Sequence, residues 1–206
     1  MRGAIIILCF LLSAVLAGNA CAGEVHEAAK SGNIARLRDL LDKDPGLLYV
    51  QDEQGKTPLH WATGRGQIEA MKVLLDEYHV DVNVRNKNGG TPLHVAASQA
   101  KPEGVRLLLQ HNADINARTK DNATPLHFAA FKLREGHLQA ARILLENKAD
   151  VNAKMNNGAT PLLLAIYNNN LPMQALLRQY GASEPQGMSR TIRKGLRGGG
   201  VSDSGY

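Results

Sequence analysis

The sequence predicts an all-α solenoid in which helix-turn-helix units stack in a row, joined by short β-hairpin or loop connections. The first observation is a tetrapeptide that recurs at intervals of 34 and 33 residues, in Thr57-Pro58-Leu59-His60, Thr91-Pro92-Leu93-His94 and Thr124-Pro125-Leu126-His127. The second is a pair of adjacent leucines in the later half of each unit, and the third is an Asp-Val-Asn or Asp-Ile-Asn triplet between units. A period of this length is typical of solenoids, because one helix pair cannot bury its apolar face alone.

The units follow one another along residues 24–183. The first has no Thr-Pro pair, but its His26 lies 34 residues before His60. The last begins with Thr160-Pro161-Leu162-Leu163, where leucine replaces the histidine. The predicted boundaries are about 24–51, 52–85, 86–118, 119–154 and 155–183. The leucine pairs are Leu40-Leu41, Leu74-Leu75, Leu108-Leu109, Leu144-Leu145 and Leu176-Leu177.

The tetrapeptide has the composition of a helix start. Threonine can accept a hydrogen bond from a free backbone N–H at the helix N-cap, and proline fits the first helical position. The leucine and a following alanine pair, such as Ala96-Ala97, provide a narrow apolar face. Gly32, Gly66 and Gly136 are expected between the two helices of a unit, where the chain turns sharply. The second helix carries a wider apolar stripe at helical spacing, for example in residues 68–75.

This period and motif resemble the ankyrin repeat, and the resemblance covers residues 24–183 as five repeats. The resemblance implies that the motif histidine ties neighbouring loops together by hydrogen bonds. It also implies a non-enzymatic module that binds another protein through its hairpin tips and through the exposed concave face of its first helices. Binding residues are concentrated at such positions because they have no packing role.

The residues expected to contact the partner follow from that pattern. They are Glu53, Gln54, Lys56 and Arg65, then Lys87, Asn88, Ser98 and Gln99, then Lys120, Asp121, Phe131, Lys132 and Arg134, and finally Asn156, Tyr167 and Asn168. Trp61 follows a motif histidine and is assigned equally to the core or to a groove. Phe131 begins a three-residue insertion that extends to about Glu135, and a tucked side chain and an interface hot spot are equal alternatives for it.

Several departures from the repeat pattern concern helix ends and chain ends. Asn112 replaces the usual glycine after a second helix and tolerates a left-handed backbone. Lys148, at the equivalent place, tolerates that backbone conformation less well and is expected to be strained. Arg178 replaces a leucine that is buried in inner repeats, as expected in a terminal cap. The basic residues of the first repeat suit the other cap. They are Lys30, Arg36, Arg38 and Lys43.

Residues 1–22 have the features of a bacterial signal peptide. Arg2 supplies a positive charge, and residues 4–16 are apolar apart from Ser13. Small residues then fit cleavage after Ala22, and cleavage after Ala20, which would leave Cys21 first, is a nearly equal alternative. The apolar run is too short to span a bilayer. We therefore expect a periplasmic or secreted protein whose mature chain has no transmembrane span.

The two cysteines fit this expectation. Cys9 lies within the predicted signal peptide, and Cys21 lies beside its cleavage site. Attachment of a lipid at Cys21 is the less favoured alternative, because the leucine that usually lies three residues earlier is absent. A mature chain starting at Gly23 has no disulfide and no cysteine for a metal site.

Composition and charge exclude some classes of function. Of the 206 residues, 44% are hydrophobic and only 4% are aromatic, so the chain can form a core but offers little for stacking nucleic-acid bases. The net charge is +5. Residues 184–206, with four basic and two acidic side chains, are predicted to form a flexible, basic, glycine-rich tail. Because the chain has so few aromatic side chains for base stacking, nucleic acid is an unlikely partner.

No catalytic or metal-binding constellation is evident. The motif histidines resemble a ladder of metal ligands only superficially, because no carboxylate or cysteine completes a ligand set. We expect no cofactor, no small-molecule substrate and no enzymatic activity, and a partner protein of unknown identity. Complex formation would give a chaperone-like or inhibitor-like role. The alternatives are a secreted effector acting on host proteins, and an enzyme subunit or a nucleic-acid binder that uses the tail.

Overall fold

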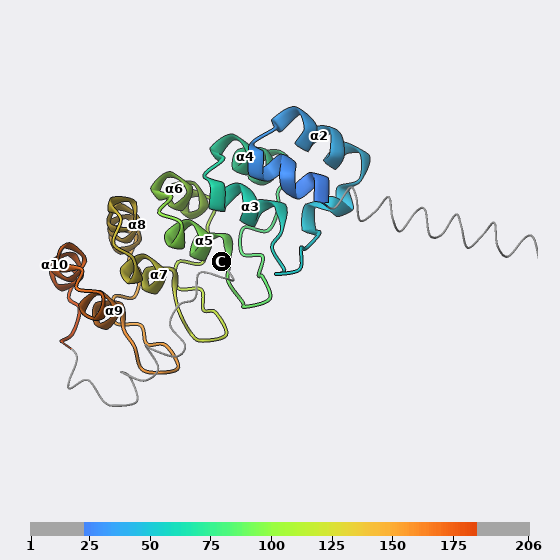
Figure 1. The fold of residues 1–206 in the computed structure, drawn as a ribbon. Helices are drawn as coiled ribbons and strands as arrows, with labels where there is room; N and C mark the ends of the chain where they lie inside the picture. Colours follow the sequence, from blue (N-terminus) through green and yellow to red (C-terminus); the bar gives the residue numbers. More distant parts are fainter. Residues whose placement is uncertain (1–22, 185–206) are drawn as a thin grey trace, which may run out of the picture.

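The structure is a computed structural model that describes residues 23–184. The predicted signal peptide and all of the predicted tail after Glu184 lie outside the described residues. Within them, five successive helix pairs stack side by side in a single row (Figure 1). The predicted all-α solenoid is confirmed. No residue between 23 and 184 belongs to a strand, so the pairs are connected by loops and turns rather than by β-hairpins.

Each pair contributes one helix to each of two layers. The first layer consists of helical residues 23–31, α3 (Pro58–Arg65), α5 (Pro92–Ser98), α7 (Pro125–Phe131) and α9 (Pro161–Tyr167). The second layer consists of α2 (Ile34–Lys43), α4 (Ile68–Lys72), α6 (Pro102–Gln110), α8 (Glu135–Glu146) and α10 (Leu171–Gln179). A short 3₁₀ helix, η1 (Pro45–Tyr49), follows α2, and a π-helical turn, η2 (Val73–Glu77), extends α4. The connecting loops project beside the first layer (Figure 1).

The core is one apolar cluster that runs the length of the row. The motif leucines Leu59, Leu93, Leu126 and Leu162 are at most 1% exposed, and the leucine pairs of the second layer join them. Neighbouring pairs therefore share each part of the core, and no pair has a core of its own. This is the packing that a solenoid requires.

The motif histidines connect each helix pair to the next loop. Nδ1 of His60 accepts the backbone N–H of Thr57 at 3.2 Å, and Nε2 donates to the carbonyl oxygen of Gly90 at 3.1 Å. The same two bonds recur in His94 with Thr91 and Ala123, and in His127 with Thr124 and Ala159. His26 keeps the second bond, to the carbonyl of Val50 at 3.0 Å. The tie between loops that the family resemblance implies is confirmed.

Burial keeps His60, His94 and His127 neutral. It lowers the pKa of His60 and of His127 to about 4, and that of His94 to about 3. The neutral form is also the form that these bonds need, because Nδ1 must accept while Nε2 donates.

Left-handed backbone marks both turns of the repeat. After the second helix it occurs at His79, Asn112, Lys148 and Gly181, where φ is 50°, 61°, 68° and 85°. The strain expected at Lys148 is thus present. Between the helices it occurs at Gly32, Gly66, Ala100 and Asn169.

The fourth pair has a different interhelical connection. Its Lys132 and Arg134 are extended, and Gly136, which we expected in the turn, lies instead in the first turn of α8. A Cβ atom at Gly136 would lie 2.8 Å from the carbonyl oxygen of Ala100. The three-residue insertion therefore moves the start of α8 against the preceding pair, and glycine permits the close approach.

Both ends of the row carry charged caps. Arg178 is exposed and pairs with Glu184 at 2.5 Å, so the charge predicted at this position points to solvent. At the other end Arg38 pairs with Glu77 at 2.6 Å, and Lys43 pairs with Asp39 at 2.6 Å. These exposed pairs give the terminal helices a hydrated outer face and add little to stability, because such pairs contribute little energy.

We predict that acid destabilises the fold. Because the folded-state pKa values of the three motif histidines lie below the ordinary value of 6.5, the unfolded chain binds more protons between pH 6.5 and about 4. Stability is therefore complete above pH 6.5 and falls below it, by about 2 kcal/mol per histidine at pH 5. Urea unfolding at pH 7 and pH 5 measures the loss. His94→Gln should reduce it, the exposed control His79→Gln should not, and equal stability at both pH values would contradict the prediction.

A second prediction concerns the left-handed lysine. Lys148→Gly should stabilise the protein by about 1 kcal/mol, because glycine adopts φ of 68° without steric cost. The matched change Asn112→Gly should give roughly half as much, since asparagine tolerates this region. Thermal unfolding of both variants provides the measurement. An unchanged or lowered melting temperature for Lys148→Gly would show that no strain resides there.

Candidate protein-interaction surface

The loop tips are bonded to one another along the row. The backbone N–H of Lys87 donates to the carbonyl of Gln54 at 3.1 Å, and that of Lys120 donates to Asn88 at 3.0 Å. The N–H of Asn156 donates to the carbonyl of Asp121 at 3.0 Å. We call these joined tips, residues 53–54, 87–88, 120–121 and 156, the tip strip. All of its side chains are exposed, so four loops that are far apart in sequence form one surface.

Side chains add further bonds between neighbouring tips. Nζ of Lys87 donates to the carbonyl of Glu53 at 2.7 Å, and the amide of Asn156 donates to the carbonyl of Lys120 at 3.0 Å. Below the tips, Arg85 and Arg118 each donate to the carbonyl of the following loop. These bonds fix the spacing of the tips, which lowers the entropy cost of binding a partner.

Most predicted contact residues are accessible in the structure. Those exposed are Glu53, Gln54, Arg65, Lys87, Asn88, Lys120, Asp121, Arg134, Asn156 and Tyr167. Gln99, Phe131, Lys132 and Asn168 are partly exposed. The expected exposure is wrong for Ser98, which is 2% exposed, and for Lys56, which is 9% exposed. Ser98 is the buried last residue of α5, and Nζ of Lys56 lies over the ring of Trp61.

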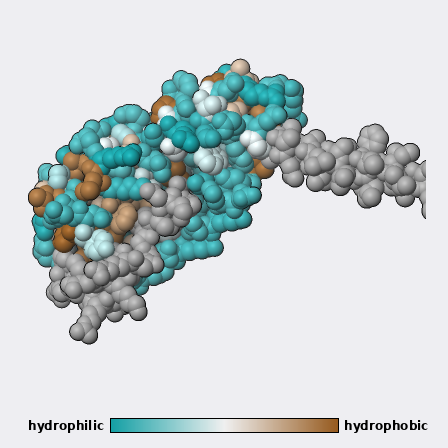
Figure 2. Space-filling model, viewed as in Figure 1, coloured by the Kyte–Doolittle hydropathy of each residue, from teal (hydrophilic) through white to brown (hydrophobic). Residues whose placement is uncertain are grey.

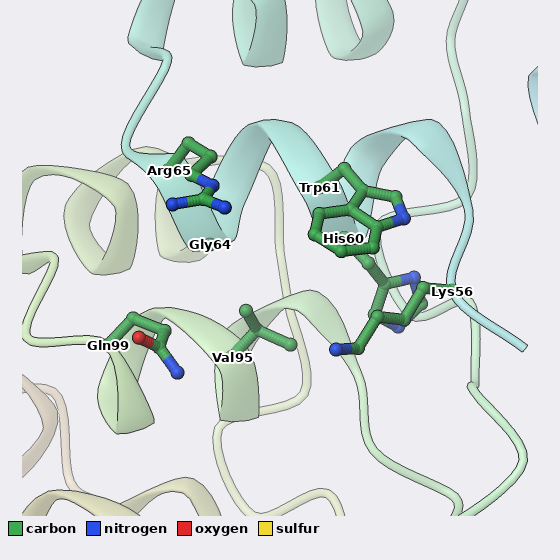
Figure 3. Close-up of a pocket in the computed structure, with 7 residues that line it drawn as sticks. All are labelled: Lys56, His60, Trp61, Gly64, Arg65, Val95 and Gln99. Carbon is green, nitrogen blue, oxygen red and sulfur yellow. The ribbon is translucent and has the colours of Figure 1, made fainter. Parts of the chain in front are cut away.

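A pocket of about 190 Å³ lies where α3 faces α5. Figure 3 shows Trp61 and Arg65 on α3 above it, with Val95 and Gln99 on α5 below and Lys56 at one end. Trp61 is partly exposed and forms a wall of the pocket, so the groove assignment is the correct one of its two alternatives.

Two lysines lie against the indole of Trp61. Nζ of Lys56 lies 5.0 Å from the ring centroid, and Nζ of Lys30 lies 5.6 Å from it, both within the range of cation–π attraction. The indole N–H donates to Asp52 at 3.0 Å, which fixes the ring. Burial lowers the pKa of Lys56, and the negative charge of Asp52 opposes that shift.

The insertion loop after α7 is held from both sides. The amides of Asn168 and Asn170 donate to the carbonyls of Phe131 and Lys132 at 2.7 and 2.9 Å. On the other side, Nε2 of His137 lies 3.0 Å from the carbonyl oxygen of Ser98. Phe131 packs against the core cluster, so its side chain is tucked.

The apolar group that this loop exposes is Leu133, which the repeat pattern does not single out. Leu133 is 67% exposed, Leu171 at the start of α10 is 65% exposed and Tyr167 is 39% exposed. The bond from Asn170 to Lys132 brings Leu171 and Leu133 to the same region. Figure 2 shows apolar side chains gathered on the surface over α8, α9 and α10. Sequence could have indicated Leu133, because it is a leucine between two cations in an insertion.

Residues 23–184 hold few groups suited to catalysis. No cluster of three or more His, Cys, Asp or Glu side chains occurs among them, and the motif histidines are committed to backbone partners. Within the same residues, none of the helices is both long and apolar enough to traverse a bilayer.

Stacked helix pairs, loops joined at their tips and a histidine bridge between pairs define a repeat protein that presents a binding surface. The sequence model for ankyrin repeats in three copies matches residues 25–119 and again residues 117–186. The chain belongs to the ankyrin-repeat family. Ankyrin repeats generally mediate protein–protein interaction and are generally non-enzymatic. A search of curated proteins gives no significant match.

The insertion loop yields a prediction that separates packing from contact. Phe131→Ala should destabilise the fold by about 2 kcal/mol, because the ring packs on the core. Arg134→Ala and Leu133→Ala, which remove exposed side chains, should each change stability by less than about 0.5 kcal/mol. Chemical denaturation measures all three, and equal losses for Phe131→Ala and Leu133→Ala would contradict this assignment.

Proposed function

We propose that the chain is an exported, non-enzymatic binding protein that holds an acidic surface of a partner protein against its tip strip and first-layer helices. The observation that carries this proposal is the tip strip, whose side chains are exposed along four bonded loops and have no role in the core. A preformed surface of this kind binds without the cost of ordering mobile loops.

Charge gives the chemistry of the partner. Among the predicted contact residues that are exposed or partly exposed, five are basic, namely Arg65, Lys87, Lys120, Lys132 and Arg134, and two are acidic, Glu53 and Asp121. A surface with this excess attracts acidic partners and speeds their association. Exposed Leu133, Tyr167 and Leu171 add an apolar contact area at one end of the row.

Export is the second part of the proposal. It rests on the charge, apolar run and small residues of residues 1–22. We place the mature chain in the periplasm or outside the cell, where binding would stabilise or inhibit the partner by mass action. The competing function is that of an effector acting on host proteins.

Fractionation of a tagged full-length chain separates these locations. Recovery in the periplasm or the medium supports export. Recovery only in the cytosol of a host cell favours the effector function. Recovery of the uncleaved chain in the cytosol of the expressing cells would rule out export. The control is a chain with Arg2 and the apolar run deleted, which should stay in the cytosol.

A charge-reversal pair tests the binding surface. Lys87→Glu with Lys120→Glu should reduce recovery of crosslinked partner at least about tenfold, because two favourable contacts become repulsive. The matched control, Lys72→Glu with Arg142→Glu, reverses two exposed charges on the second layer and should leave recovery unchanged. Partner recovery is measured by quantitative crosslinked pull-down from the native compartment. Equal recovery with both pairs would rule out the tip strip as the binding surface.

A further inference from the structure

The pocket between α3 and α5 carries more positive charge than its surroundings neutralise. Two cations line it, Lys56 and Arg65, and no ion pair joins either side chain to another residue within 23–184. Lys30, the other cation near Trp61, differs in this respect because it pairs with Glu27 at 2.9 Å.

The carboxylate of Asp52, whose charge acts on Lys56, already accepts three hydrogen bonds. Oδ1 of Asp52 accepts the backbone N–H groups of Gln54 and Lys56, both at 2.8 Å. Oδ2 accepts the indole N–H of Trp61 at 3.0 Å. Asp52 therefore shapes the pocket wall, and its negative charge acts on the ammonium group of Lys56 without forming a direct ion pair with it. Burying a cation in this way costs free energy that an incoming anion would offset.

The polar groups converge on one space. Figure 3 shows the ammonium of Lys56, the guanidinium of Arg65 and the amide of Gln99 all turned toward the gap between α3 and α5. Trp61 and Val95 supply apolar walls on either side. His60, whose burial keeps it neutral, closes the base and contributes no charge. This arrangement is complementary to a ligand group that has a short apolar chain ending in an anion.

Size decides what kind of ligand fits. A volume of about 190 Å³ is below the range of roughly 300–1,000 Å³ typical of sites that enclose a whole small molecule. It is sufficient for one side chain of a larger ligand. Binding of single-stranded nucleic acid would need a series of aromatic platforms, and Trp61 is the only tryptophan in the chain.

We infer that this pocket binds the carboxylate side chain of an acidic segment in the partner protein. The carboxylate accepts hydrogen bonds from Lys56 and Arg65, and its methylene groups lie between Trp61 and Val95. This inference deepens the proposed function and rests on it, since it makes the pocket the place where the first-layer surface recognises glutamate or aspartate.

Trp61 provides a reporter inside the pocket. A six-residue poly-glutamate peptide, with both ends blocked, is titrated into the protein at low salt while the tryptophan fluorescence is followed. We expect a saturable change that a matched poly-glutamine peptide does not produce. Absence of any saturable change with poly-glutamate would overturn the inference.

Variants assign the binding to the two cations. Lys56→Gln and Arg65→Gln should each weaken peptide binding about tenfold, the value of one charge-assisted hydrogen bond. Lys56→Arg should restore most of the affinity, and Lys72→Gln on α4, which removes an exposed cation of the second layer, should have no effect. Because Arg65 is exposed, its variant keeps the test valid if Lys56→Gln fails to fold. Unchanged affinity in Arg65→Gln and in folded Lys56→Gln would overturn the inference.

Competition distinguishes other anions. Excess poly-glutamate should displace a fluorescent copy of itself, whereas inorganic phosphate or an oligothymidylate of equal charge should displace it much less. Stronger displacement by either phosphate compound would overturn the carboxylate assignment. If the peptide experiments fail while crosslinking of the partner still depends on Lys87 and Lys120, the pocket assignment is wrong and the proposed function stands. If crosslinking no longer depended on Lys87 and Lys120 while the poly-glutamate peptide still bound, the tip strip would be ruled out and the pocket assignment would stand.

Discussion

The histidine that bridges adjacent helix pairs is the interaction on which the rest of the structure depends. One neutral ring accepts from the start of its own helix and donates to the loop of the next pair, for example from Thr57 through His60 to Gly90. The bond fixes both a helix start and the distance to the neighbour. Since it recurs three times with distances of 3.1 to 3.2 Å, the loops keep a constant spacing and their tips can bond to one another. The tip strip, which is assembled from separate loops, becomes rigid for this reason.

Periodicity made the fold predictable from sequence. The helix pairs, the buried leucines, the bridging histidines and the strained Lys148 all follow from positions that repeat, because each repeated residue meets the same neighbours. Gly136 shows the limit of that reasoning. The repeat pattern predicts it in the turn with Gly32 and Gly66, whereas the insertion shifts it into α8 against Ala100.

The candidate site was predictable only in outline. Tip residues such as Lys87 and Asp121 are exposed because loops must be, and that much follows from the pattern. The burial of Lys56 and the position of Trp61 in a pocket wall depend on side chains of two pairs meeting across the row. Leu133 has no equivalent position in the other repeats, so the repeat pattern does not indicate it. Periodicity predicts the contacts that recur in every repeat, such as the histidine bridge, but it does not predict contacts between side chains that differ from repeat to repeat or features that occur in one repeat only.

The insertion loop between α7 and α8 also bears on how a ligand aligns with the row. A strictly periodic surface offers a long ligand several equivalent alignments, displaced by one repeat each, and the complex is then a mixture. Leu133, Phe131 and the displaced start of α8 occur at one place only. They distinguish this position from every other along the row. A ligand that contacts both this loop and the tip strip therefore has one alignment and one direction along the row.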